Sequence, residues 1–326
     1  MHILVGDLGG THTRLALAEL DTGRVGLARV ARYINSEHAD LNAILAHFLA
    51  AGGAAGELAC CLAVAGPTDG LSVQFTNLDW RIETAALTTQ FGFADCRLIN
   101  DFAAIGWGLN TLAPDALATL QSGQALAGAA VALGAGTGLG VSLCVWRDDH
   151  YRPLPSEGGH VAFAPCNAEQ DRLLAHLRPL YGRVSVERIL SGPGLLDLFR
   201  FCLREAGRDN SPLLESPHPA AAISQAGLDR TDPAALHCLH LFAEIYGQTA
   251  GDWALATQAR GGIFLAGGIA PKLLPVLQSS VFLDAFNRKG RYSAWMSSVP
   301  VSVILDPDIG LKGAAFAASN LGAHFR

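Results

Sequence analysis

The sequence predicts an α/β protein built from two related lobes, each with a mixed sheet flanked by helices. The first observation is a pattern near the start of the 326-residue chain, where apolar strands flank the turn Gly9-Gly10-Thr11. The second is a repeat of this pattern, in which two apolar runs flank Gly136-Thr137-Gly138. The third is the alternation of short apolar runs with helix-length segments along the whole chain. Two copies of one hairpin indicate two lobes of related design.

The elements of the first lobe follow from apolar runs of strand length and from the helix-length segments between them. We expect strands at 2–6, 13–20, 25–33, 58–65, 71–76 and 97–100, and helices at 41–51, 82–92 and 102–110. A connector then leads to the second hairpin.

The second lobe begins with the hairpin at 129–146 and is mostly helical afterwards. We expect helices at 168–180, 186–190, 192–206, 219–226, 232–259, 271–279 and 310–320, strands at 261–266 and 299–305, and a loop at 207–219. Ser185 and Ser191 are expected to cap the helices that follow them. The small-residue-rich last helix is expected to cross back to the first lobe. The predicted lobes are therefore 1–110 plus 310–326, and 111–309.

The composition argues against several classes of partner and location. A net charge of −6 without any Lys/Arg run disfavours nucleic acid and anionic membrane surfaces as partners. Seven cysteines, an odd number without a framework spacing, indicate buried thiols in a reducing cytosol. The chain opens directly with a core strand instead of a signal peptide, so we expect a cytoplasmic protein.

One stretch, 116–146, has no charged residue and is long enough to span a bilayer. Its glycines cluster in the middle, between Val- and Leu-rich runs, which disfavours a single helix. The hairpin interpretation explains the same residues better, and no membrane segment is expected.

The two glycine turns have the chemistry of phosphate-binding loops. Glycine lets backbone N–H groups approach an anion closely, and Thr11 and Thr137 each add a hydroxyl donor. Asp7 precedes the first turn, where it can hold a phosphate-bound Mg²⁺ through water. The pattern is neither the Rossmann strand-to-helix turn nor the Walker loop. Ordinary hairpin turns remain the alternative for either copy taken alone.

A third glycine turn, Gly267-Gly268, follows the buried strand 261–266 and is placed to contact a base or ribose. The three turns in this order resemble the phosphate 1, phosphate 2 and adenosine motifs of the actin–hexokinase–Hsp70 superfamily. The resemblance implies two actin-like (ribonuclease-H-like) lobes that share a nucleotide across an interlobe cleft.

Asn100 and Asp101 stand at the end of the strand predicted at 97–100. This is the carboxyl edge of the predicted sheet, where α/β proteins place ligands. Asp101 can accept a proton from a substrate hydroxyl, while Asn100 hydrogen-bonds a neighbouring one. The alternative is that Asp101 caps the helix at 102–110.

The two glycines in Glu157-Gly158-Gly159-His160 let the chain bend, so that the acid and the imidazole can both point into one pocket. Such a pair suits polyol recognition. The alternative is a zinc site using His160 and Cys166, but these are too few ligands for structural zinc. Glu187 lies in the first turn of a predicted helix, so stabilisation of the helix dipole is its plainest role.

Taken together, these residues resemble the bacterial ATP-dependent glucokinases of enterobacteria and cyanobacteria, nearly from end to end. The shared motifs are Gly6-Asp7-Leu8-Gly9-Gly10-Thr11, Ala65-Gly66-Pro67, Thr76-Asn77-Leu78-Asp79-Trp80, Leu98-Ile99-Asn100-Asp101-Phe102, Gly134-Ala135-Gly136-Thr137-Gly138-Leu139-Gly140, Glu157-Gly158-Gly159-His160, Val186-Glu187-Arg188-Ile189-Leu190-Ser191-Gly192 and Leu265-Ala266-Gly267-Gly268-Ile269.

The resemblance implies a kinase that transfers the γ-phosphoryl group of ATP to the 6-hydroxyl of glucose, with Mg²⁺. It implies that glucose is held by Asn100, Asp101, Glu157, His160 and Glu187, with Asp101 as the general base. It further implies that ATP is bound by Asp7, Gly9, Gly10, Thr11, Gly136, Thr137, Gly138, Gly267 and Gly268, and that the protein is a homodimer. The related repressor/kinase family has a cysteine-rich zinc motif after its own Glu-x-Gly-His. The residues 161–167 lack this motif, so no zinc is expected.

Three other functions remain open at this point. A kinase for another hexose differs too little in sequence to be separated. A sugar-responsive transcription regulator of the same fold would place a helix-turn-helix before the first hairpin, which here starts at residue 3. A filament-forming actin relative would not need the set of Glu157, His160 and Glu187.

Overall fold

The computed structural model describes residues 2–21, 24–52, 58–75 and 80–321. The chain divides into two compact units, each described here by itself. Unit 1 comprises Met1–Pro114, Arg147–Pro155 and Asp306–Arg326, and unit 2 comprises Asp115–Trp146 and Ser156–Leu305. The predicted boundaries differ for Arg147–Pro155, which was expected in the second lobe. This segment groups with unit 1 because His150 stacks on Trp107 and Tyr151 N–H donates to Asn110.

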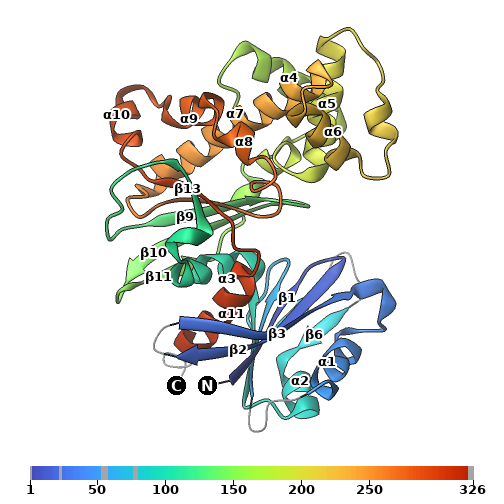
Figure 1. Cartoon of the computed structure of the whole chain (residues 1–326), viewed down its shortest axis with the longest axis vertical. Helices are drawn as coiled ribbons and strands as arrows, with labels where there is room; N and C mark the ends of the chain where they lie inside the picture. Colours follow the sequence, from blue (N-terminus) through green and yellow to red (C-terminus); the bar gives the residue numbers. More distant parts are fainter. Residues whose placement is uncertain (1, 22–23, 53–57, 76–79, 322–326) are drawn as a thin grey trace. The chain divides into compact units, whose positions relative to one another are not determined.

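Unit 1 is built on a five-stranded sheet with the order β3-β2-β1-β4-β7 (Figure 1). β1, β2 and β3 form an antiparallel meander, whereas β1, β4 and β7 run parallel. The strands are β1 His2–Leu8, β2 His12–Asp21, β3 Arg24–Ile34, β4 Ala59–Val64 and β7 Asp95–Asn100, with a separate pair of β5 Ser72–Gln74 and β6 Arg81–Glu83.

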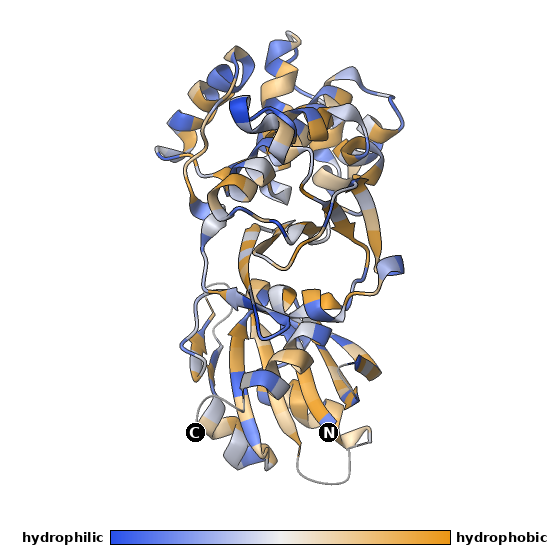
Figure 2. Ribbon diagram, turned by 90° about the vertical axis from the view of Figure 1, so that its left-hand side faces the viewer, coloured by the Kyte–Doolittle hydropathy of each residue, from blue (hydrophilic) through white to orange (hydrophobic). Residues whose placement is uncertain are grey.

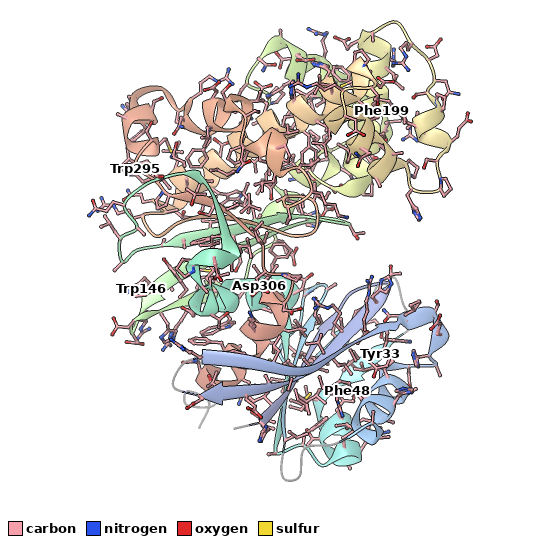
Figure 3. The ribbon with its side chains drawn as sticks, viewed as in Figure 1. Tyr33, Phe48, Trp146, Phe199, Trp295 and Asp306 are labelled. Atoms are coloured by element: carbon pink, nitrogen blue, oxygen red, sulfur yellow. The ribbon has the colours of Figure 1, made fainter. Side chains whose placement is uncertain are left out.

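Helices cover both faces of this sheet because successive side chains along a strand point to opposite faces. Leu4 and Leu8 join the core under α1 and α2, which includes Phe48 (Figure 3). Ile3 and Val5 join the opposite core, under α3 and α11. The helices of unit 1 are α1 Leu41–Ala50, α2 Thr84–Phe91, α3 Asp101–Gly108 and α11 Ile309–Leu321, with the 3-10 helices η1 Asn35–Glu37 and η2 Leu109–Thr111.

The second sheet repeats this design in the order β11-β10-β9-β12-β13-β8. β9 pairs antiparallel with β10 and parallel with β12, as β1 does with β2 and β4. The predicted repeat of the two hairpins is therefore confirmed. The strands are β8 Leu117–Gln121, β9 Ala130–Ala135, β10 Leu139–Arg147, β11 His150–Leu154, β12 Gly262–Ala266 and β13 Val301–Ile304.

Unit 2 is mostly helical beyond its sheet, as predicted, and Phe199 lies in its core (Figure 3). Hydrophobic residues dominate the strands of both sheets, whereas the helices mix hydrophobic and hydrophilic residues (Figure 2). The helices are α4 Ala168–Tyr181, α5 Gly192–Glu205, α6 Pro219–Leu228, α7 Pro233–Thr257, α8 Leu274–Leu277, α9 Ser280–Asn287 and α10 Ser293–Met296, and the 3-10 helices are η3 Pro114–Ala116, η4 Gly158–His160, η5 Val186–Arg188, η6 Pro212–Glu215 and η7 Gly290–Tyr292.

Several local predictions are wrong. The expected connector contains β8, which pairs antiparallel with β13 far along the chain, a partner that no local pattern reveals. The start of the helix predicted at 82–92 belongs to β6, and the loop predicted at 207–219 contains η6. The helix predicted at 271–279 is shortened to α8, and α9, which follows it, was not predicted. The helix predicted at 186–190 is only the 3-10 helix η5.

The two predicted N-caps have opposite outcomes. The Ser191 side chain accepts the N–H of Gly194 at the start of α5, so this cap is confirmed. Ser185 makes no side-chain cap hydrogen bond to η5, so that prediction is wrong.

The charge-free stretch 116–146 forms strands, including both strands of the second hairpin. No helix among the described residues is long and apolar enough to cross a membrane. Thr76, Asn77, Leu78 and Asp79, from the predicted strand 71–76 and a quoted family motif, lie outside the described residues, as do 322–326 of the predicted first lobe.

Candidate active site

The first glycine turn connects β1 and β2 at the edge where β1 ends. Gly10 and Thr11 are exposed, and the N–H of Gly9 donates to the carbonyl of His12 at 3.0 Å. The tip of the turn, Gly10 and Thr11, is therefore open to solvent, as an anion-binding turn requires.

Asn35 holds this turn in place. Its Nδ2 donates to the Gly9 carbonyl at 2.9 Å, its Oδ1 accepts from the Thr13 hydroxyl at 2.9 Å, and its backbone N–H donates to the Thr11 carbonyl at 3.0 Å. The residue is 2% exposed. Sequence reasoning missed Asn35, whose only signal is an amide at the end of the long strand β3.

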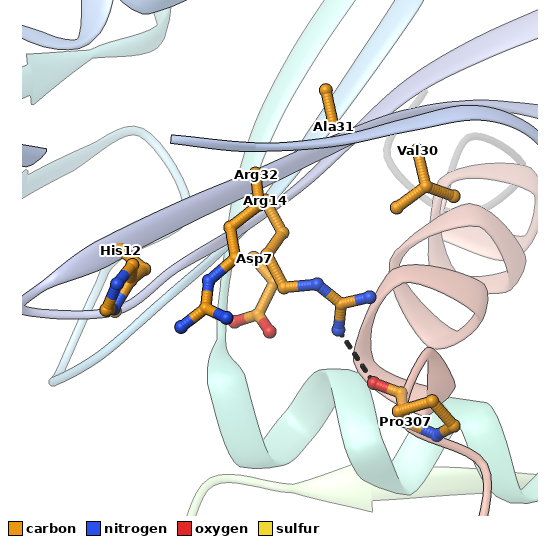
Figure 4. A pocket seen from close by; sticks show the side chains of 8 residues that line it. Asp7, His12, Arg14, Val30, Ala31, Arg32 and Pro307 are labelled. Carbon is orange, nitrogen blue, oxygen red and sulfur yellow. Dashed lines mark hydrogen bonds between the residues drawn. The ribbon is translucent and has the colours of Figure 1, made fainter. Parts of the chain in front are cut away.

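Asp7 lies two residues before the turn, on the sheet face that meets α11. In the strand register, Asp7 of β1 lies opposite Arg14 of β2, and Arg14 lies opposite Arg32 of β3. Burial raises the pKa of Asp7, and the nearby Arg14 charge lowers it. These side chains line a pocket of about 510 Å³ together with Gly9, His12 and Pro307, and Arg14 donates to the Pro307 carbonyl (Figure 4).

Asn100 and Asp101 lie at the same sheet edge as the first turn. Leu8, Val64 and Asn100 form one row across β1, β4 and β7. Strands are about 4.8 Å apart, so the ends of β1 and β7 are roughly 10 Å apart. The parallel topology therefore brings the first turn and Asp101 to one edge of unit 1.

Asn100, not Asp101, is the N-cap of α3. Its Oδ1 accepts the N–H groups of Phe102 and Ala103, at 2.9 and 3.1 Å, and its Nδ2 donates to the Gly66 carbonyl at 3.3 Å. Asp101 is therefore not the N-cap residue, but its Oδ1 also accepts the N–H of Phe102, at 2.9 Å. Asp101 is half-buried in the first turn of α3.

The second glycine turn is contacted by the segment that follows α4. The N–H of Gly192 donates to the Gly136 carbonyl at 2.8 Å, and Glu187 Oε2 accepts the N–H of Leu139 at 3.0 Å. Thr137 is exposed at the tip. Glu187 lies in a helix of only three residues, too short for a dipole role to explain it.

Glu157 and His160 flank two buried glycines, and both are exposed. Nδ1 of His160 lies 3.9 Å from Oε1 of Glu187. A Cβ on Gly159 would lie 1.9 Å from the Leu139 carbonyl oxygen, so this segment runs directly against the residue after the turn. Unit 2 therefore brings Glu157, His160 and Glu187 to the second turn.

The third glycine turn packs against the end of β9, directly before the second glycine turn. Gly267 has φ +79°, and a Cβ there would lie 2.6 Å from the Ala135 carbonyl, so only glycine fits without strain. Ile269 N–H donates to that carbonyl at 3.2 Å. Gly267 and Gly268 are exposed beside the second turn, but the turn leads into α8 only after residue 273, later than predicted.

The metal-binding potential of the described residues is limited. They contain no group of three or more His, Cys, Asp or Glu side chains that could hold a metal ion. Cys166 is exposed, and its thiol contacts the Ala164 carbonyl.

Comparison with known proteins gives consistent matches. The family model for glucokinase matches residues 4–321. The glucokinase of Nostoc punctiforme is 37% identical, over 98% of this chain and 99% of its own length. That of Chromohalobacter salexigens is 39% identical, over 97% of each chain. The crystal structure of a glucokinase from an Antarctic psychrotroph is 31% identical and superposes with a TM-score of 0.87, covering 98% of this chain and 99% of the other.

Proposed function

The chain belongs to the glucokinase family, and from this premise we propose that it transfers the γ-phosphoryl group of ATP to the 6-hydroxyl of D-glucose. The observation that carries the proposal is a family match along nearly the whole chain, with glycine turns at corresponding places in two related sheets. The resemblance and the α/β fold predicted from the sequence are both confirmed by these matches.

In this proposal the sugar is held by five polar residues. Asn100 and Asp101 act from the start of α3, and Glu157, His160 and Glu187 act from unit 2. Each hydroxyl of a hexose is a donor and an acceptor, so carboxylates and an imidazole can pair with several of them. The exposure of Glu157 and His160 supports this role.

Asp101 is the proposed general base. It takes the proton of the 6-hydroxyl as that oxygen attacks the γ-phosphorus in line. Phosphoryl transfer depends mostly on positioning and electrostatics, which the backbone N–H groups of both turns supply.

The nucleotide enters as its magnesium complex. Gly9, Gly10 and Thr11 bind phosphate from unit 1, and Gly136, Thr137 and Gly138 from unit 2, while Gly267 and Gly268 border the adenosine. The Asp7 carboxylate is a hard oxygen donor, which suits Mg²⁺ held through water. A cytoplasmic location and a homodimer are part of the same proposal.

The test is sugar-dependent ADP release by the purified chain with Mg-ATP. Turnover is expected with glucose and to be much weaker with mannose, fructose and N-acetylglucosamine. Removal of Mg²⁺ with EDTA should stop it, and added Mg²⁺ should restore it. Preferred turnover of another sugar would replace glucose as the substrate, and no turnover with any sugar would overturn the kinase assignment.

A further inference from the structure

The carboxylate of Glu187 contacts two parts of the proposed site at once. Oε2 accepts the N–H of Leu139, the residue directly after the second glycine turn, at 3.0 Å. Oε1 lies 3.9 Å from Nδ1 of His160. The side chain is 26% exposed, so Oε1 remains within reach of a ligand while Oε2 is engaged.

The Glu187 carboxylate can occupy this position only because residue 138 is glycine. A Cβ on Gly138 would lie 2.5 Å from Oε2, closer than any stable contact. A Cβ on Gly136, in the same turn, would meet nothing within 4 Å. Neither residue has a left-handed φ, so alanine is compatible with the backbone at both.

The other polar group of Leu139 meets the second sugar segment. Its carbonyl oxygen would be 1.9 Å from a Cβ on Gly159, between Glu157 and His160. Both segments proposed to hold the hexose in unit 2 therefore contact the backbone of the same residue, Leu139. A shift of either segment must displace the end of the phosphate turn.

We infer that Glu187 is a positioning residue that couples hexose binding to the second phosphate turn, in addition to contacting the sugar. This inference rests on the proposed function. A sugar hydroxyl that donates to Oε1 fixes the carboxylate, and the fixed Oε2 holds Leu139 N–H and so the turn. Coupling between two binding sites is reciprocal, so a change in the turn that displaces the Glu187 carboxylate must alter sugar affinity, and loss of that carboxylate must alter nucleotide affinity.

The first experiment changes the turn and measures glucose binding by calorimetry without nucleotide. Gly138→Ala displaces the carboxylate and is expected to weaken glucose binding about tenfold, the usual size for loss of a charged hydrogen bond. Gly136→Ala is the matched control, because it adds the same methyl group to the same turn without touching Glu187. It is expected to leave glucose affinity within about twofold of the parent.

The second experiment changes the acid and measures Mg-ADP binding without sugar. Glu187→Ala is expected to weaken Mg-ADP binding about fivefold or more, because Leu139 N–H loses its acceptor. Glu187→Gln keeps an acceptor oxygen and should restore binding to within about twofold. Glu157→Ala removes a sugar contact that has no bond to the turn, and should also leave Mg-ADP binding within about twofold.

The outcomes separate this inference from the proposed function. Glucose turnover by the parent chain, with Gly138→Ala equal to Gly136→Ala in glucose affinity, overturns the coupling and keeps the kinase. Unchanged Mg-ADP affinity in Glu187→Ala also overturns it. If Gly138→Ala does not fold by circular dichroism, the Glu187 series decides. Absence of glucose turnover in the parent chain overturns the proposed function itself.

Discussion

The two glycine turns share one backbone design but are held in different ways. The first is fixed by Asn35, a neutral side chain that is almost fully buried and bonds both to Gly9 and to Thr13. The second is fixed by Gly192 N–H and by Glu187, an acid that is partly exposed and is also a candidate sugar contact.

This difference separates two kinds of support. A buried neutral amide such as Asn35 contributes to stability and to the shape of the nucleotide site. A partly exposed acid such as Glu187 is also available to the substrate. Changes to Asn35 should therefore alter stability and nucleotide binding alone, whereas changes that displace Glu187 should also alter sugar binding.

The largest expected effect is a loss of kcat on changing Asp101, a residue that lies in neither turn. The effects of the other variants can be compared with this loss. Asp101→Asn removes the proposed base and should lower kcat by about 10²–10⁴-fold. Mg-ADP affinity without sugar should change less than about twofold. Steady-state kinetics and calorimetry measure both quantities, with Asp115→Asn at an exposed site as the control. A variant that keeps a tenth of the parent kcat would exclude Asp101 as the base.

Asn35→Ala breaks the support of the first turn. It leaves the Gly9 carbonyl and the Thr13 hydroxyl without their partner, which should lower the free energy of unfolding by about 3 kcal/mol. The KM for ATP should rise about tenfold while the Kd for glucose stays unchanged. Urea unfolding, kinetics and calorimetry test these expectations.

The control for this variant is Asn42→Ala, since the Asn42 amide makes only a 3.5 Å contact with Asp40. Weaker glucose binding in Asn35→Ala but not in Asn42→Ala would contradict the proposed independence of the first turn from the sugar.

Thr13→Val sharpens the same comparison with a smaller change. Valine has nearly the shape of threonine, but it leaves Oδ1 of Asn35 without its donor inside the core. The free energy of unfolding should fall by about 1–2 kcal/mol, and the KM for ATP should rise less than in Asn35→Ala. If Thr13→Val raised the KM for ATP as much as Asn35→Ala or more, the Thr13 hydroxyl, and not the Asn35 amide, would be the main support of the turn.

The smallest effect is expected at the cap of α5, next to the second turn. Ser191→Ala should cost about 1 kcal/mol of unfolding free energy, because the Gly194 N–H loses its acceptor. Ser185→Ala is a matched control, since Ser185 makes no cap bond to η5. Similar losses in the two variants, measured by urea unfolding, would show that the cap bond contributes little.

Local sequence patterns were enough to predict elements that depend on nearby residues, such as glycine turns between apolar strands. Both hairpins follow from such patterns, and Ser191 is the cap that its position before an apolar helix predicts. β8 and the two-strand pair of β5 and β6 were incompletely predicted because short strands depend on their pairing partners.

The sequence offers candidates for the site residues, whose roles stay predictions, but it does not reveal the contacts that support them. Asn35 closes a contact with Gly9 across 26 residues, and Glu187 reaches Leu139 across 48. Neither contact has a periodic signal, and only the folded arrangement reveals it. The same holds for the cap of α3, which is Asn100, whereas the sequence offered Asp101 only as an alternative.

The packing of α11 has a consequence for how the protein is made on the ribosome. This helix covers the face of the first sheet that carries Ile3 and Val5, and a Cβ on Gly313 would lie 1.7 Å from the Ala104 carbonyl of α3. The first strands leave the exit tunnel long before α11 does. The part of their apolar face that α11 covers therefore stays exposed throughout the synthesis of unit 2, and the earliest-made sheet is completed last.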